Sequence, residues 1–202
     1  MRNREMVFMF FTSGKSAADV PREQLMALQK AHIGNLERLY KEGVSPLAGP
    51  LSDPDKKRRG IVLLNIKHAH ETPRHFESDP YVKQGYMKVE AYPVRVPVMD
   101  IGKPEESAIA EHTIALLQAN EPVSDAVLRE WEERLIRLPR SERPRLLVVR
   151  RDSREPLAMV ALFVESDAAK VEAVLASIAP KEPKRGEWKV WKQWLSKGVL
   201  PA

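Results

Sequence analysis

The chain has 202 residues, a length that fits one large domain or two small ones. Hydrophobic residues make up 43% and charged residues 30%, which predicts a folded core and excludes wholesale disorder. The absence of cysteine excludes disulfides, thiolate catalysis and cysteine-ligated metals, and the net charge of +5, with both signs interspersed, gives little support for a nucleic-acid partner.

No apolar run reaches the roughly 18 residues that a membrane helix needs, so no membrane partner is expected. The N-terminal apolar run 6–11 is short and is followed by "TSGK", which favours a first strand over a signal peptide. We therefore expect a soluble, cytoplasmic protein. The alternative is a secreted form whose leader has been trimmed.

The first half of the chain has the element order β-α-β-β-α-β, which is typical of a ferredoxin-like fold. Its strands are predicted from continuous or alternating apolar runs, at residues 6–11, 45–51, 61–67 and 86–96. A helix is predicted from Pro21 to Gly43, because apolar residues recur there at every third or fourth position. A weak helix or two turns, broken by prolines, is predicted within residues 70–85.

The second half repeats this order after a linker at residues 98–110, which gives domains at 1–97 and 111–202. Its helices are predicted at residues 124–138, with Ser124 or Asp125 as the N-cap, and at 167–179. Its strands are predicted at residues 112–119, 144–151, 157–165 and 187–195, with a turn at 152–156.

Matching letters support a duplication of the first half. "HIGNLERL" lies over "WEERLIRL" at an offset of 99 residues, and "GYMKVEAYPV" lies over "GEWKVWKQWL" at an offset of 101. One face of a ferredoxin-like sheet needs a cover, and a second copy on the same chain would supply it. The predicted fold is therefore α+β, with tandem ferredoxin-like domains packed as an intrachain dimeric α+β barrel. A cavity beside the sheets would hold a ligand.

Four stretches of the first half carry a resemblance: "HIGNLERLYKEG", "PLAGPL", "RRGIVLLNI" and "ESDPYVKQGYMKVEAYPVRV". Together they are similar to the YCII-related family of small dimeric α+β barrel proteins with a ferredoxin-like fold, over roughly residues 6–96. The resemblance implies an active site built on a histidine and an aspartate, which here fall on His32 and Asp79. The second half resembles the family as a degenerate copy, in which Trp131 replaces His32 and Pro180 replaces Asp79.

The residues themselves leave two interpretations of this pair open. A neutral histidine is a natural general base, and a carboxylate on its other ring nitrogen would fix the tautomer and stabilise the imidazolium. Alternatively, His32 is an idle core histidine and Asp79 is a turn residue or a cap. If the pair is functional, the duplicated chain has one site where a symmetric dimer would have two.

The functional prediction is a small-molecule enzyme that uses His32 as general acid or base and Asp79 as its orienting group. Thr12, Ser52 and Tyr81 are weaker candidates for substrate-binding groups in the cleft. No cofactor motif is present, so a cofactor-free lyase, isomerase or hydrolase is expected.

Two further sequence features and one rival function are weighed against this prediction. The rival function is a non-catalytic ligand-binding or interaction module. The histidines of "KHAHETPRH" are interpreted as a solvated loop rather than a metal site, and the tryptophans of the last strand as a cover for the barrel rather than a nucleic-acid surface. A monomer and a homodimer both fit the sequence.

Overall fold

A computed structural model describes residues 4–105, 108–119, 121, 123–151, 157–179 and 186–201. Its contacts divide the chain into two compact units. The first unit is Met6–Pro93, and the second is Val94–Ala202 together with the N-terminal residues up to Glu5. Within the described residues, no helix has both the length and the apolar character needed to cross a membrane.

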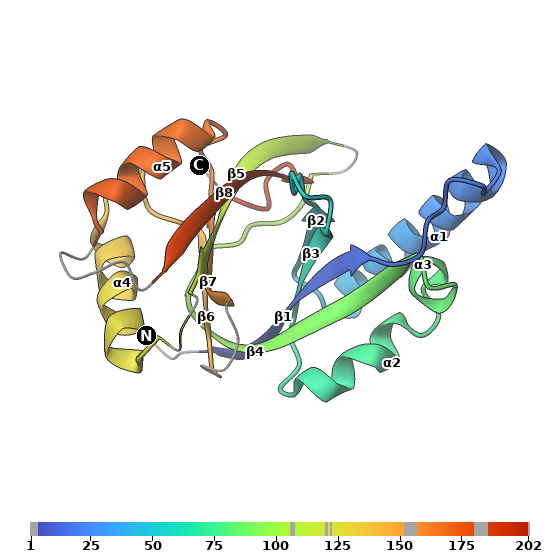
Figure 1. Ribbon diagram of the computed structural model, residues 1–202, viewed down its shortest axis with the longest axis horizontal. Helices are drawn as coiled ribbons and strands as arrows, with labels where there is room; N and C mark the ends of the chain where they lie inside the picture. Colours follow the sequence, from blue (N-terminus) through green and yellow to red (C-terminus); the bar gives the residue numbers. More distant parts are fainter. Residues whose placement is uncertain are drawn as a thin grey trace. The chain divides into compact units, whose positions relative to one another are not determined.

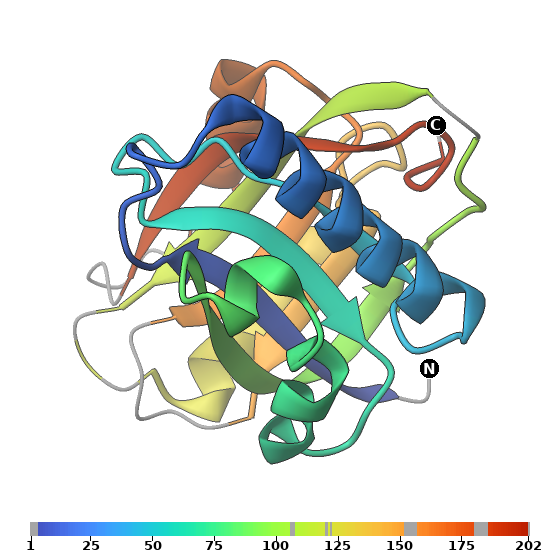
Figure 2. The ribbon, with the colours of Figure 1, turned by 90° about the vertical axis from the view of Figure 1, so that its right-hand side faces the viewer.

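The first unit is a four-stranded sheet with helices on one face (Figure 1). The strand order is β2-β3-β1-β4, and β3 pairs antiparallel with both β1 and β2. The strands are β1 (Arg4–Ser13), β2 (Leu47–Pro50), β3 (Arg58–Leu64) and β4 (Met87–Met99). The helices are α1 (Arg22–Lys41), a 3-10 turn (Ala69–Glu71), α2 (Thr72–Phe76) and α3 (Pro80–Lys83). Helix α1 runs along the sheet beside α3 (Figure 2).

The core of the first unit lies between the sheet and its helices. Strand β1 is apolar over residues 6–11 and alternates between the two faces, so every second side chain of this run points toward the helices. The helix-facing core consists of Val7, Met9, Phe11, Leu39, Val62, Leu64, Ile66 and Phe76. Helix α1 ends at Lys41, and Gly43 follows with φ of +71°, a left-handed conformation that glycine adopts without strain.

The second unit has the same arrangement of strands. Its order is β6-β7-β5-β8, with the C-terminal part of β4 paired antiparallel with β6. In both units the second strand is at one end, followed by the third, the first and the fourth. The elements are β5 (Ile109–Gln118), α4 (Asp125–Arg137), β6 (Leu146–Arg150), β7 (Leu157–Phe163), α5 (Ala168–Ser177) and β8 (Glu187–Ser196). Both helices lie on one face of this sheet (Figure 1).

The predicted α+β fold class and the ferredoxin-like element order are confirmed in both halves. The weak helix expected within residues 70–85 is the 3-10 turn with α2 and α3, which are separated where Pro80 begins a new helix. Strand β4 continues to Met99 and β5 begins at Ile109, so both strand ends reach into the segment 98–110 that is predicted as the linker. Ser124 is the N-cap of α4. The turn at 152–156 lies outside the described residues.

Candidate functional site

His32 lies on the sheet-facing side of helix α1. The buried residues of this helix are Leu28, His32, Asn35 and Leu39, spaced by four, three and four positions, which places them on one face. His32 is 7% exposed. On its buried face, helix α1 therefore places the imidazole of His32 and the amide of Asn35 next to each other, with a leucine on either side.

Asp79 is the N-cap of the short helix α3. It precedes Pro80, and its extended backbone (φ −67°, ψ 122°) is the conformation favoured before a proline. Asp79 Oδ1 accepts hydrogen bonds from the backbone N–H groups of Tyr81 at 3.1 Å and Val82 at 3.4 Å. The residue is completely buried. These two backbone donors thus fix the plane of the carboxylate independently of its contacts with other side chains.

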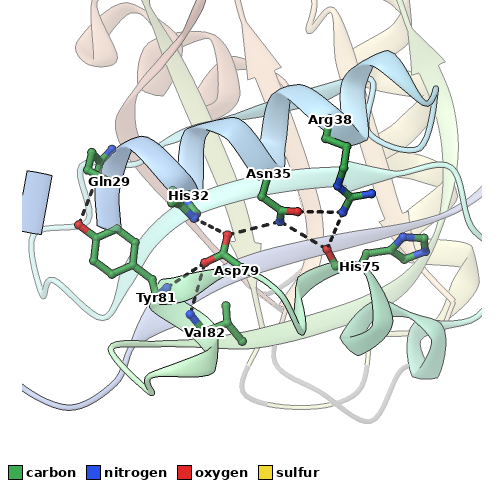
Figure 3. A network of polar contacts seen from close by, with 8 residues as sticks. All are labelled: Gln29, His32, Asn35, Arg38, His75, Asp79, Tyr81 and Val82. Atoms are coloured by element: carbon green, nitrogen blue, oxygen red, sulfur yellow. Dashed lines mark hydrogen bonds and ion pairs between the residues drawn. The ribbon is translucent and has the colours of Figure 1, made fainter. Parts of the chain in front are cut away.

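The second oxygen of Asp79 contacts His32. The distance between His32 Nδ1 and Asp79 Oδ2 is 2.7 Å, and Asn35 Nδ2 donates to the same oxygen at 3.4 Å (Figure 3). A carboxylate only accepts hydrogen bonds, so the proton of a neutral imidazole belongs on Nδ1 and the lone pair on Nε2. This arrangement prepares Nε2 to accept a proton, with the buried carboxylate stabilising the imidazolium that results.

Aromatic rings surround the imidazole. Phe11 lies 5.0 Å and Tyr81 lies 5.5 Å from the His32 ring, both edge to face, and Phe76 packs on Phe11 at 5.3 Å. Such rings exclude water, and a lower local dielectric strengthens the interaction between Asp79 and a protonated His32.

Tyr81 joins helix α3 to the beginning of α1. Its hydroxyl donates to Gln29 Oε1 at 3.2 Å and approaches the carbonyl of Leu25 at 3.5 Å. Burial raises the pKa of Tyr81, the charge of Asp79 raises it further, and the charge of Arg59 lowers it. Because the net shift is upward from 10.0, the phenol stays protonated at neutral pH and acts as a hydrogen-bond donor.

A second layer of polar contacts ties α1 to α2. Arg38 donates to Asn35 Oδ1 at 2.8 Å, and both Asn35 and Arg38 donate to the carbonyl of His75 at 3.4 Å (Figure 3). Burial lowers the pKa of His75, and the charges of Arg74 and Arg38 lower it further. The contacts of Asn35 with Arg38, with the His75 carbonyl and with Asp79 orient its amide group toward Asp79.

The structure brings three of the five predicted site residues together, namely His32, Asp79 and Tyr81. Thr12 follows Phe11 on β1, so strand alternation directs its side chain to the face opposite His32. Ser52 is exposed in the turn after β2. Among the described residues, neither side chain has a hydrogen bond to the pair, and their substrate-binding role stays a prediction.

Sequence reasoning missed Asn35, the residue that shares Asp79 with His32. A signal was present, because Asn35 is three positions after His32 and so falls on the same helix face. The contact with Asp79 joins residues 44 positions apart, and no local pattern predicts it.

The histidine-rich segment between β3 and α2 is a separate feature. His68 and His70 stack at 5.3 Å, and Glu71 is engaged by Arg74 at 2.7 Å. Within the described part of the chain, no three histidine, aspartate or glutamate residues are grouped as metal ligands.

Trp131 is the predicted counterpart of His32 in the second unit. Trp131 lies on α4, is 8% exposed, and packs edge to face on Trp188 at 5.5 Å. It belongs to the core of its own unit, together with Leu128 and Leu135. Pro180, the predicted counterpart of Asp79, lies outside the described residues.

Two crystal structures share the fold over nearly the whole length, and each is named "putative monooxygenase". The protein of Lactobacillus acidophilus NCFM is 8% identical, with 97% of this chain and 98% of that chain covered and a TM-score of 0.54. The protein of Fusobacterium nucleatum is 10% identical, with 99% and 98% covered and a TM-score of 0.58. No curated protein matches the sequence significantly.

The family comparison concerns the half of the chain that holds the His32–Asp79 pair. Residues 6–96 match the YCII-related domain, and this range covers β1 through most of β4. The range agrees with the resemblance drawn from the four sequence stretches. Residues 6–96, just under half of this chain, therefore match the model of a YCII-related domain.

Proposed function

We propose that the first unit is a small-molecule enzyme in which His32 transfers a proton and Asp79 orients and stabilises it. The observation that carries this proposal is the 2.7 Å contact between His32 Nδ1 and Asp79 Oδ2, made by a carboxylate whose other oxygen is held by two backbone amides. A carboxylate fixed in this way does not need to reorganise when the imidazole becomes charged.

The reaction begins with the substrate at Nε2 of His32. Nε2 removes a proton from an acidic C–H or O–H group, and the buried carboxylate of Asp79 stabilises the imidazolium. Returning the proton to another atom gives an isomerisation. Delivering it to a leaving group gives an elimination when the proton came from a C–H group, whose electron pair forms the new double bond, or a hydrolysis when it came from a water whose oxygen bonds to the substrate. Both fold neighbours are named as enzymes, which supports an enzymatic function for this chain.

The rival function is a ligand-binding module in which the pair only stabilises the fold. Asp79 caps α3, and His32 satisfies the remaining oxygen of a buried carboxylate. In that case Nε2 never exchanges a proton with a ligand. The two functions therefore differ in one measurable property, the catalysis of proton exchange.

The test is deuterium incorporation into a panel of carbon acids, such as ketones and 2-oxo acids, followed by proton NMR in heavy water. The wild type should accelerate exchange of at least one compound. His32→Gln should lower that rate by about 10² to 10⁴-fold, the usual contribution of a general base. His70→Gln, which removes an exposed histidine outside the site, is the matched control and should leave the rate unchanged.

Folding is checked in the same samples from the NMR spectra of both variants. The proposal is wrong if a folded His32→Gln variant retains the exchange rate of the wild type. It is also wrong if the wild type accelerates exchange of none of the compounds, which would leave the ligand-binding module as the better description.

A further inference from the structure

Helix α1 carries a line of apolar side chains that its own unit leaves uncovered. Met26 is 63% exposed, Ile33 44% and Tyr40 41%. They are seven residues apart, which is close to two helical turns, so they follow one another along the same side of the helix. Among the described residues, the other large apolar side chain with high exposure is Ile109, in the second unit.

This line is not needed to hold α1 on its sheet. The buried face of the helix already makes that contact, and in Figure 2 the helix lies in front of the sheet of its unit. Single apolar side chains on a surface need no explanation, whereas a row of them beside charged residues is typical of a contact with another protein. The outward side of α1 is therefore a candidate interface.

Four charged residues accompany the apolar line. They are Glu23, Lys30, Glu37 and Lys41, all exposed, and their signs alternate along the helix. In the part of the chain that the structure describes, none of the four forms an ion pair. Elsewhere on the same helix Arg38 and Glu42 do pair, at 2.7 Å. We call the apolar line and this charged row together the outer face of α1.

The outer face is complementary to itself in an antiparallel arrangement. A two-fold axis at Ile33 sets this residue against its own copy, and Met26 against Tyr40, since each lies seven positions from the axis. The same rotation keeps the charged rows on one side and sets Lys30 against Glu37, which lie three and four positions from the axis. A parallel pair would place the two charged rows on opposite sides, where neither gains a partner.

We propose that the outer face of α1 is a homodimer interface, in which two copies of this chain pack their α1 helices antiparallel around Ile33. The proposal is independent of the proposed function, because His32 lies on the buried face of the same helix. One helix from each copy buries less than the roughly 800 Å² per partner that is usual in stable complexes. The dimer should therefore exchange with the monomer.

The test is sedimentation equilibrium of the full chain, from about 1 µM to about 1 mM, the range in which weak complexes dissociate. The wild type should change from monomer to dimer across this range. Ile33→Glu sets two like charges against each other at the centre of the interface and should raise the dissociation constant at least about tenfold. Ile109→Glu is the matched control at an exposed position of the second unit, and should leave the constant within about twofold.

Charge reversal tests the antiparallel arrangement. Lys30→Glu and Glu37→Lys should each weaken the dimer by about three- to tenfold, because the two-fold axis repeats each unfavourable contact. The double variant Lys30→Glu with Glu37→Lys restores opposite charges and should return to within about twofold of the wild type. Within one chain the two positions are about 10 Å apart along the helix, too far for an ion pair, so the rescue requires a second copy.

The substituted positions are exposed, and an NMR spectrum of each variant shows whether the fold is kept. A wild type that stays monomeric over the whole range overturns the proposal. A dimer that survives in Ile33→Glu, or weakens equally in Ile109→Glu, also overturns it, since the contact then lies on another surface. Single reversals that weaken the dimer without rescue in the double variant overturn the antiparallel pairing.

Discussion

At the scale of single residues, Asp79 performs two tasks with its two oxygens. Oδ1 caps α3 and Oδ2 receives His32. Asp79→Asn separates the two tasks, because an asparagine has a single oxygen. The backbone amides of α3 demand that oxygen, so the new NH₂ group must face His32. The imidazole then has to present Nδ1 as an acceptor, which moves its proton to Nε2.

The expected outcome is a change of tautomer, visible in long-range ¹H–¹⁵N spectra of the imidazole. The wild type should show a protonated Nδ1 and the Asn variant a protonated Nε2, with loss of any proton-exchange activity. The exposed His70 serves as an internal reference in the same spectrum. An unchanged His32 tautomer in a folded variant would mean that Asp79 does not control the imidazole.

At the scale of elements, the close contact between the segment after β1 and the beginning of β4 depends on Gly14, whose backbone N–H donates to the carbonyl of Tyr86 at 2.9 Å. A Cβ at Gly14 would lie 2.2 Å from the carbonyl oxygen of Gly85, a backbone atom that cannot move aside cheaply. Gly14→Ala should therefore destabilise the first unit by about 1–3 kcal/mol, as overpacking does. Gly34 in α1 is the matched control, because a Cβ there meets nothing within 4 Å.

Gly34→Ala should stabilise the same unit by about 0.5–1 kcal/mol, since alanine is the better helix former. Both effects are measured by urea unfolding followed through tyrosine NMR signals. All four tyrosines are at positions 40–92, so these signals report on the first unit. The steric argument is refuted if both substitutions shift the midpoint in the same direction.

The elements were the most predictable part of this protein. Helix α1 and the strands follow from apolar periods of 3.6 and 2 and from the proline and glycine at the helix ends. The face of Thr12 could not be predicted, because "MVFMFF" is apolar on both sides of β1 and the pattern carries no alternation. The pairing of His32 with Asp79 came from the family resemblance, since the contact spans 47 positions and has no local signal.

At the scale of the whole molecule, the two units share one strand order and differ in their polar residues. The first holds four of the five histidines, and the second holds His112 and all four tryptophans. Tryptophan fluorescence therefore reports on unfolding of the second unit. This division allows each unit to be followed separately in the intact chain, which matters because two units need not unfold together.

His112 makes the stability of the second unit depend on pH. It lies on β5, is 4% exposed, and its Nδ1 is 3.3 Å from the carbonyl oxygen of Val164. Burial lowers the pKa of His112 below 6.5, and the bond to Val164 opposes this effect only in part. The folded unit thus keeps the imidazole neutral where the unfolded chain already binds a proton. The contribution of neutral His112 to the free energy of unfolding is therefore fully present above about pH 6.5, and it is lost as the pH falls toward the folded pKa.

The expected loss is at most about 1.4 kcal/mol for each pH unit in this window, the limit for one proton. Urea unfolding followed by tryptophan fluorescence at about pH 7 and pH 5.5 measures it. His112→Gln should flatten the dependence, because it keeps a donor for Val164 and cannot be protonated. His70→Gln should leave the slope as it is, since that residue lies in the first unit. If the free energy of unfolding of His112→Gln still falls with pH as in the wild type, the pH dependence comes from carboxylates of the second unit and not from His112.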